Sequence, residues 1–329
     1  MWQSSDVAST LSIIDTVITK EINQFVSNFS LDAREKLLTI INSKKDKFKG
    51  IFSTENAQIL ADSLNQPIEE LMLKLLPLAS LYARASISKF KVGAVSRGES
   101  GNLYLGGNME FIGQPLSMSV HAEQSSITNA WLNGEIGLST IAINYLPCGY
   151  CRQYLNELVT ASNLKILLPN QPPTKLVDLL PHPFGSSDLG FKGGLMQVEN
   201  HNLQLQENSN DPVILAALQA ANKSYAPYSE DYSGMALLTT DGKIYTGQYA
   251  ENAAFNPSMS PLQSALAHMN VGGNLYQDIK RAVLVERVPS ASLCSHGDTT
   301  RSLLKSVSKV KLEVVYLTQK AKVGHLNFS

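Results

Sequence analysis

The first stretch of the chain carries apolar residues at the spacing of a helix. Leu11, Ile14 and Ile18 recur three to four positions apart, so they share one helical face. The pattern ends in a solvated run of charges at residues 44–47. It predicts a helical N-terminal extension over residues 1–48.

Beyond this extension, helical and extended patterns alternate. A helix is predicted from Gln66 to Ala83, with Pro67 suited to its first turn. Two strands, a helix, a buried strand and a further helix follow, over residues 91–96, 103–107, 121–132, 141–146 and 148–159. Helices that alternate with strands in this way indicate an α/β layered fold.

The second half of the chain partly repeats the first. The repeated residues, displaced by 141 positions, are Gly93, Gly101, Tyr104 and Gly106 with Gly234, Gly242, Tyr245 and Gly247. Two further pairs, displaced by 144, are Asn108 with Asn252 and Phe111 with Phe255. This alignment places Ala254 opposite Glu110. The displacement indicates an old duplication rather than a short-period solenoid.

A stretch rich in proline and glycine at residues 169–194 separates the two halves and is typical of a long connection. The predicted domains are therefore a first α/β domain at 49–168, a linker at 169–208 and a second domain at 209–329.

Composition narrows the classes of function. Lysine and arginine total 27 against 28 for aspartate and glutamate, and the absence of a basic run argues against a nucleic-acid footprint. The most apolar stretch, residues 71–83, falls short of the roughly 20 continuous apolar residues of a membrane span. Three cysteines do not form a disulfide framework. We therefore expect a cytoplasmic protein that binds neither nucleic acid nor membrane.

Two short motifs carry the candidate chemistry. His121-Ala122-Glu123 precedes Pro147-Cys148-Gly149-Tyr150-Cys151 by one predicted strand, and together they form the His-x-Glu and Pro-Cys-x-x-Cys signature of zinc deaminases. One imidazole and two thiolates leave a tetrahedral zinc with an open position, which marks a catalytic site. His121, Cys148 and Cys151 are thus the predicted zinc ligands.

Glu123 is the predicted proton shuttle. It lies two residues from His121, near enough to reach a zinc-bound water without ligating the metal. Zinc lowers the pKa of such a water to about 7 and supplies hydroxide at neutral pH. Glu123 would take the water proton, protonate the ring nitrogen as hydroxide attacks, and later protonate the departing amine.

Residues 49–329 resemble the two-domain, homodimeric bacterial-type cytidine deaminases. The resemblance implies a duplicated three-layer α/β/α sandwich with a mixed central sheet, in which a catalytic copy precedes a degenerate one. It also implies one zinc ion per chain and hydrolysis of cytidine and 2'-deoxycytidine to uridine and 2'-deoxyuridine plus ammonia, as in pyrimidine salvage. The partners implied are a small nucleoside and a second copy of the chain.

The same resemblance assigns the substrate contacts. Asn108 and Glu110 match the residues that bind the ribose hydroxyls, and in an extended chain they face the same way. Phe90 and Tyr145 match residues that contact the pyrimidine. The backbone of Ala122 and of Leu146 would address the base edge, and Phe184 would reach the ring from the partner subunit. Arg152 either tempers the thiolate charge or is an ordinary surface cation.

The second half lacks the motif. Pro261-Leu262-Gln263 stands where His-Ala-Glu would recur, and Cys294 has no cysteine three residues away. We therefore predict a single zinc, with Cys294 an ordinary thiol.

Two alternatives remain open. A deaminase of cytosine or adenine in a polynucleotide would use the same zinc chemistry, but the balanced charge and the ribose-binding pair favour a free nucleoside. A non-enzymatic protein with a structural zinc would need a fourth protein ligand.

Overall fold

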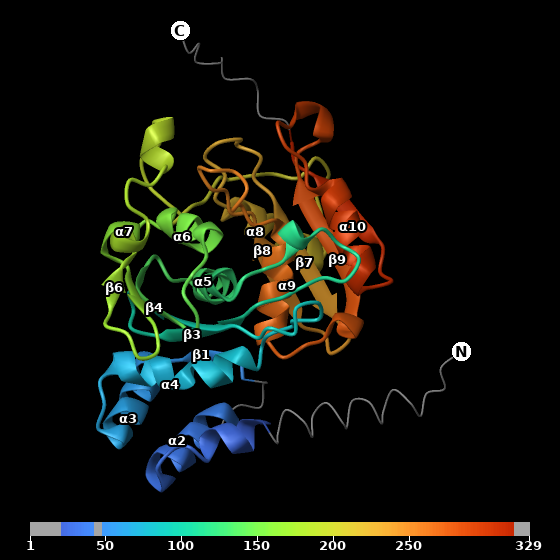
Figure 1. The fold of residues 1–329 in the computed structure, drawn as a ribbon. Coiled ribbons are helices and arrows are strands. Elements are labelled where there is room, and N and C mark those ends of the chain that lie inside the picture. Colours follow the sequence, from blue (N-terminus) through green and yellow to red (C-terminus); the bar gives the residue numbers. More distant parts are fainter. Residues whose placement is uncertain (1–20, 43–47, 319–329) are drawn as a thin grey trace.

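The computed structural model describes residues 21–42 and 48–318, so part of the predicted helical extension, residues 1–20 and 43–47, lies outside the described residues. Figure 1 shows two sheets with helices on both faces of each. The predicted duplicated α/β/α architecture is therefore confirmed. Among the described residues, no helix combines the length and the apolar character that crossing a membrane requires.

The first sheet is mixed and has six strands in the order β1-β3-β2-β4-β5-β6. The strands are β1 (Ile51–Phe52), β2 (Gly93–Gly98), β3 (Leu103–Gly107), β4 (Leu138–Ile143), β5 (Lys165–Leu167) and β6 (Thr174–Lys175). β4 and β5 are parallel, and the other neighbours are antiparallel.

Helices cover both faces of this sheet. The helices of the first copy are α2 (Leu31–Asn42), α3 (Thr54–Leu64), α4 (Ile68–Ser80), α5 (Ala122–Leu132), α6 (Gly149–Asn156) and α7 (Leu176–Leu179), with short 3₁₀ turns at Leu116–Met118, Ala161–Asn163 and Ser186–Leu189. α3 and α4 lie on one face and α5 on the other, and α2 packs outside α3 (Figure 1). Buried Leu37 and Ile40 of α2 join the same apolar cluster as Leu60 and Leu75, so the described part of the extension contributes to this core.

The second sheet repeats the central four strands in the order β10-β9-β7-β8. Its elements are α8 (Pro212–Asn222), β7 (Gly234–Thr239), β8 (Ile244–Gln248), α9 (Pro261–Val271), β9 (Ile279–Glu286), α10 (Gly297–Val307) and β10 (Leu312–Tyr316), with 3₁₀ turns at Tyr276–Asp278 and Pro289–Ala291. β9 and β10 are again the parallel pair.

The two copies share one core. α5 and α9 lie against each other between the sheets (Figure 1), and Ile127 of α5 belongs to the same buried cluster as Leu266 of α9. Every residue of α5 from Ala122 to Trp131 is buried. A helix buried on all sides shows no amphipathic stripe, which is why periodicity alone indicates it weakly.

The repeated residues have common physical reasons. Gly101 and Gly242 take positive φ angles of 89° and 82° in the turns before β3 and β8, a conformation that glycine adopts without strain. A Cβ atom on Gly106 would lie 2.2 Å from the backbone nitrogen of Ser126. The same distance separates a Cβ on Gly247 from the Ala265 nitrogen, so both glycines allow a helix to approach its sheet closely.

The structure corrects the alignment of the copies beyond these residues. The displacement of 141 continues, because the bridge between Arg84 and Met109 recurs between Tyr225 and Ala250. The counterparts of Asn108 and Glu110 are therefore Tyr249 and Glu251, not Asn252 and Ala254, and the pairing of Phe111 with Phe255 fails for the same reason. No insertion precedes Glu251.

The length change lies in the loop before the central helix. His121 is the N-cap of α5, and its backbone nitrogen donates to the side-chain oxygen of Gln124 at 3.0 Å. Ser260 is the N-cap of α9, and its backbone nitrogen donates in the same way to Gln263 at 2.9 Å. Residues 260–262, rather than 261–263, thus replace His-Ala-Glu, and the motif is absent in either register.

Several element limits differ from the prediction. The buried strand is Leu138–Ile143 rather than 141–146, and α6 ends at Asn156. α3 and β1 were not predicted. Strand β6 and helix α7 lie inside the predicted linker and extend the first copy. The domain limits themselves stay predictions.

Candidate metal centre and nucleoside pocket

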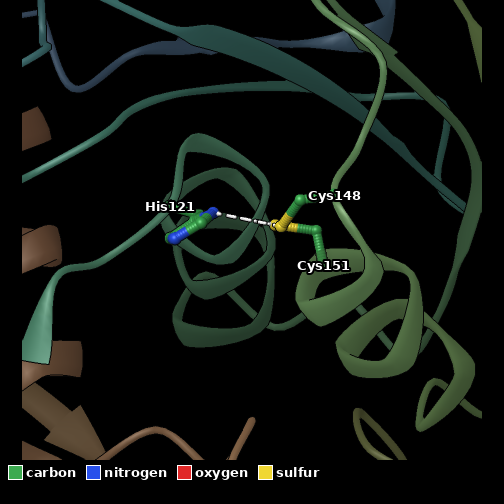
Figure 2. A group of neighbouring side chains, drawn as sticks. All are labelled: His121, Cys148 and Cys151. Atoms are coloured by element: carbon green, nitrogen blue, oxygen red, sulfur yellow. Dashed lines mark hydrogen bonds between the residues drawn. The ribbon is translucent and has the colours of Figure 1, made fainter. Parts of the chain in front are cut away.

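Three potential metal ligands from two helices meet beneath a cavity. The Nδ1 atom of His121 lies 3.1 Å from the sulfur of Cys151 and 3.7 Å from that of Cys148, and Figure 2 shows these side chains pointing toward one another. All three ligand atoms lie within 4.8 Å of each other. Tetrahedral zinc with Zn–S near 2.3 Å and Zn–N near 2.0 Å separates its ligands by roughly 3.5 to 3.8 Å, so the donor set and its spacing fit zinc.

The pKa values of the two sulfurs are shifted in opposite directions. The pKa of Cys148 is lowered to about 3, because the Cys151 thiol and His121 donate hydrogen bonds to its sulfur. The pKa of Cys151 is raised, first because its thiol is the donor to Cys148 and then because it is buried. Ligation requires both thiolates, so zinc binding would release the proton that the pair shares.

Helix starts place these ligands. His121 is the N-cap of α5, and Cys148 is the N-cap of α6, whose first turn contains Cys151. The positive ends of both helix dipoles thus face the site and favour thiolate. Arg152 donates to the Pro147 carbonyl at 2.8 Å and to the Leu179 carbonyl at 2.8 Å, so it ties the Cys-x-x-Cys loop to α7.

Glu123 lies beside the ligands but outside the group that could hold the ion. Its side chain is 4% exposed, and burial raises its pKa. It lines the same cavity as His121 and Cys148. A buried carboxylate in this place can exchange protons with a small molecule in the cavity.

The cavity measures ≈ 470 Å³, within the range of about 300–1,000 Å³ that small-molecule sites occupy. Its lining contains most of the predicted residues, namely Phe90, Asn108, Glu110, His121, Ala122, Glu123, Tyr145, Leu146 and Cys148. It also contains residues that the sequence analysis missed, namely Ser88, Val92, Leu116, Ser119 and Val120. Cys151 is fully buried below it.

Glu110 is built as an ionised acceptor. Its carboxylate accepts hydrogen bonds from the Ile87 nitrogen at 2.6 Å, from the Ser88 nitrogen at 2.9 Å and from the Ser88 hydroxyl. Although burial acts to raise its pKa, the hydrogen bonds from Ser88 and Ile87 lower it overall. Carboxylate lone pairs left free by these donors can accept hydroxyl groups from the cavity.

Asn108 holds the wall that carries Phe90. Its oxygen accepts from the Val92 nitrogen at 2.9 Å, and its amide donates to the Phe90 carbonyl at 3.0 Å. One amide N–H remains for a ligand.

Two aromatic rings stand at the edge of the cavity. The centroids of Phe90 and Tyr145 lie 4.5 Å apart with the planes tilted by 41°, and both rings are about half exposed. Such a pair offers an apolar surface to a planar base. Phe184 does not line the cavity of its own chain; the carbonyl of Phe184 accepts from Gln153 and Asn156.

The second copy has no equivalent centre among the described residues. Glu251 repeats the loop contacts of Glu110, since it accepts from the nitrogens of Tyr228 and Ser229 and from the Ser229 hydroxyl. Tyr249, at the position of Asn108, is buried, and its ring lies 4.2 Å from that of His296. Burial raises the pKa of Glu251, in contrast to Glu110.

The family match and the curated relatives agree with this geometry. The family described as "Cytidine and deoxycytidylate deaminase zinc-binding region" matches twice, over residues 66–165 and 176–301. A cytidine deaminase of Aliivibrio fischeri is 45% identical over 89% of this chain and 96% of its own length. That of Cronobacter sakazakii is 47% identical over 82% of this chain and 90% of its own. A crystal structure of cytidine deaminase from Mycobacterium tuberculosis is 30% identical over 35% of this chain and 96% of that chain, with a TM-score of 0.33.

The zinc-binding region matches both copies, and the relatives align along nearly their whole length. The chain therefore belongs to the cytidine and deoxycytidylate deaminase family.

Proposed function

We propose that this chain hydrolyses the exocyclic amine of cytidine and 2'-deoxycytidine, releasing ammonia and the corresponding uridine nucleoside. One observation carries the proposal: His121, Cys148 and Cys151 gather at the base of a cavity that also contains the buried carboxylate of Glu123. The curated relatives, which are named cytidine deaminases, support the choice of substrate.

The three ligands would hold zinc, and zinc when bound lowers the pKa of a water molecule to about 7 and so supplies a nucleophile. Glu123 would accept the proton of the attacking water. It would then donate that proton to the ring nitrogen N3 as the water oxygen attacks C4. It would finally take the second proton from the hydroxyl group now on C4 and pass it to the departing amine. The buried position of Glu123 suits this role, because burial raises the pKa of its carboxyl group and so makes the carboxylate a better proton acceptor.

Glu110 and Asn108 would orient the sugar. The ionised carboxylate of Glu110 can accept the ribose hydroxyl protons, while Asn108 offers its remaining amide N–H. Phe90 and Tyr145 would contact the pyrimidine, and the backbone of Ala122 and of Leu146 would address its polar edge. These contacts fix the base with its C4 carbon toward Glu123.

A homodimer in the cytoplasm belongs to the same proposal. Phe184 is 48% exposed and lies outside the cavity of its own chain. A second subunit would be needed to bring such a residue to the base.

The test is turnover of cytidine, followed by ultraviolet absorbance or ammonia release, with and without a chelator. We expect turnover that stops when zinc is removed and returns when it is restored. A matched assay on a cytosine-containing oligonucleotide should give a far lower rate. Preference for the oligonucleotide would select the polynucleotide alternative.

Exchange of Glu123 for Gln separates the enzyme from a structural zinc protein. General acid–base catalysis contributes about 10²–10⁴-fold to the rate. The kcat of Glu123→Gln should therefore fall by about 10²-fold or more, while its zinc content is unchanged. Unchanged kcat in Glu123→Gln would contradict the shuttle.

A further inference from the structure

The helix that carries the metal-binding cysteines is held at its far end by the second copy. Glu157 is the C-cap of α6 and is 3% exposed. Its carboxylate accepts hydrogen bonds from the hydroxyl of Tyr225 at 2.7 Å, from the hydroxyl of Tyr228 and from the backbone nitrogen of Ala253 at 2.8 Å. All three donors belong to the second copy.

A second contact from the same copy binds the last turn of α6. Asn252 is fully buried and donates from its side-chain amide to the carbonyl of Gln153 at 2.9 Å. Carbonyls in the last turn of a helix have no partner within the helix, so this amide acts as an external cap. The Ala254 nitrogen donates to the Asn252 side-chain oxygen at 3.0 Å and fixes the orientation of the amide. We call these contacts, Glu157 with Tyr225, Tyr228 and Ala253, and Asn252 with Gln153, the α6 clamp.

The carboxylate of the second copy that corresponds to Glu110 supports the clamp. Glu251 accepts from the backbone nitrogen of Tyr228 at 2.7 Å. It thereby fixes the loop from which the Tyr228 hydroxyl reaches Glu157. At the corresponding position Glu110 faces the nucleoside cavity, whereas Glu251 is 4% exposed.

The clamp breaks the symmetry of the duplication. α10 is the counterpart of α6, and its last turn contains Lys305 and no acidic residue. The first copy hydrogen-bonds to α10 through an exposed contact between Gln114 and Ser302, at 3.1 and 3.2 Å. Packing of two similar halves therefore does not by itself require a buried carboxylate at this place.

We propose that the α6 clamp positions Cys148 and Cys151 for zinc, so that the second copy serves as a scaffold for the metal centre of its own chain. α6 has only eight residues, too few for a stable helix without tertiary support. Arg152 holds its first turn through the Pro147 carbonyl, and the clamp holds its last turn. Glu157, Tyr225, Tyr228 and Asn252 are thus positioning residues. The inference rests on the proposed function, because zinc is the ligand that it concerns.

The test compares tyrosine-to-phenylalanine exchanges within the second copy. The double variant Tyr225→Phe/Tyr228→Phe removes two donors to Glu157. The matched control, Tyr245→Phe, removes a buried hydroxyl that hydrogen-bonds to the Gly272 carbonyl at 3.2 Å and to the Asn274 side chain at 2.8 Å, both within the second copy. Zinc transfer from the purified full chain to a chromogenic chelator is timed for each protein at the same interval below its own melting temperature, which removes differences in global stability.

Loss of outer contacts to a metal site typically costs 10–100-fold in affinity. We expect zinc to leave the double variant about tenfold faster or more, and added zinc to restore its turnover of cytidine. Tyr245→Phe should release zinc within about twofold of the wild-type rate. Equal release from the double variant and the control would overturn the clamp.

If the double variant does not fold, the rate of zinc release is measured on the single variant Tyr228→Phe. This half-buried ring can lose its hydroxyl without leaving a cavity. Release at the wild-type rate from that variant would also overturn the proposal. The proposed function fails separately: a wild-type chain that holds zinc but does not deaminate cytidine refutes the activity and leaves the release experiment valid. A wild-type chain without zinc refutes both.

Discussion

The two related carboxylates, Glu110 and Glu251, allow a controlled test of nucleoside binding. Each accepts hydrogen bonds from two backbone nitrogens and one serine hydroxyl, but only Glu110 lines the cavity. We predict that Glu110→Gln raises KM for cytidine, whereas Glu251→Gln leaves KM unchanged.

The magnitude follows from the bond that is lost. A hydrogen bond to a charged group contributes about 1.5–3 kcal/mol, which corresponds to roughly 10- to 150-fold in KM. Because the ribose does not change in the reaction, its contact should act equally on substrate and transition state, so kcat should stay nearly constant. Glu251→Gln should instead lower the free energy of unfolding by about 1–3 kcal/mol, since an amide nitrogen then faces two buried donors.

The assay is steady-state kinetics on cytidine with urea unfolding of the same preparations. KM does not depend on the fraction of chains that hold zinc, so a weakened α6 clamp in Glu251→Gln would lower the maximal rate without disturbing the comparison. If Glu110→Gln has the KM of the wild type, or if Glu251→Gln shifts KM equally, the assignment of Glu110 to the ribose is wrong.

Three further predictions concern metal content, pH and packing. Metal analysis should find one zinc per chain, and two would show a second centre. Burial lowers the pKa of His296 to about 4, so its stability penalty is absent above its unfolded pKa of about 6.5, grows as pH falls and is complete below about 4, where it reaches about 3 kcal/mol. In urea titrations, His296→Gln should lose less unfolding free energy than the wild type between pH 7.5 and pH 5. An equal loss in the two proteins would contradict this prediction. Gly106→Ala should cost about 1–3 kcal/mol or more, because its Cβ would meet the Ser126 nitrogen at 2.2 Å; an unchanged melting temperature would refute this close approach.

The sequence predicts well which side chains gather at the candidate metal centre, because two of the three lie in one short motif. Cys148 and Cys151 are one helical turn apart, and a helix start brings His121 to them. The strand pattern likewise predicts β3 with its observed limits. The cysteine pair and strand β3 are local features, so residue type and periodicity determine them.

Features set by tertiary packing are predicted less well. α5 is buried on every side and lacks an amphipathic pattern, so periodicity does not show this burial, although the predicted limits of 121–132 agree with the observed Ala122–Leu132. The predicted alignment matched Asn252 with Asn108 because both are asparagines. The backbone hydrogen bonds instead show that Tyr249 is the counterpart of Asn108. The partners of Glu157 come from residues about 70 to 100 positions away, and no local pattern indicates such contacts.

Helix caps show what the first copy gives up for its chemistry. His121 occupies the N-cap of α5 without a side-chain cap hydrogen bond. At the same place in α9, the Ser260 hydroxyl accepts from the Gln263 nitrogen. A good N-cap contributes about 0.5–2 kcal/mol, so the first copy forgoes this stabilisation to present an imidazole to a metal. The second copy, free of that demand, has an ordinary cap on α9, and its contacts with Glu157 and Gln153 can then hold the helix on which the metal centre depends.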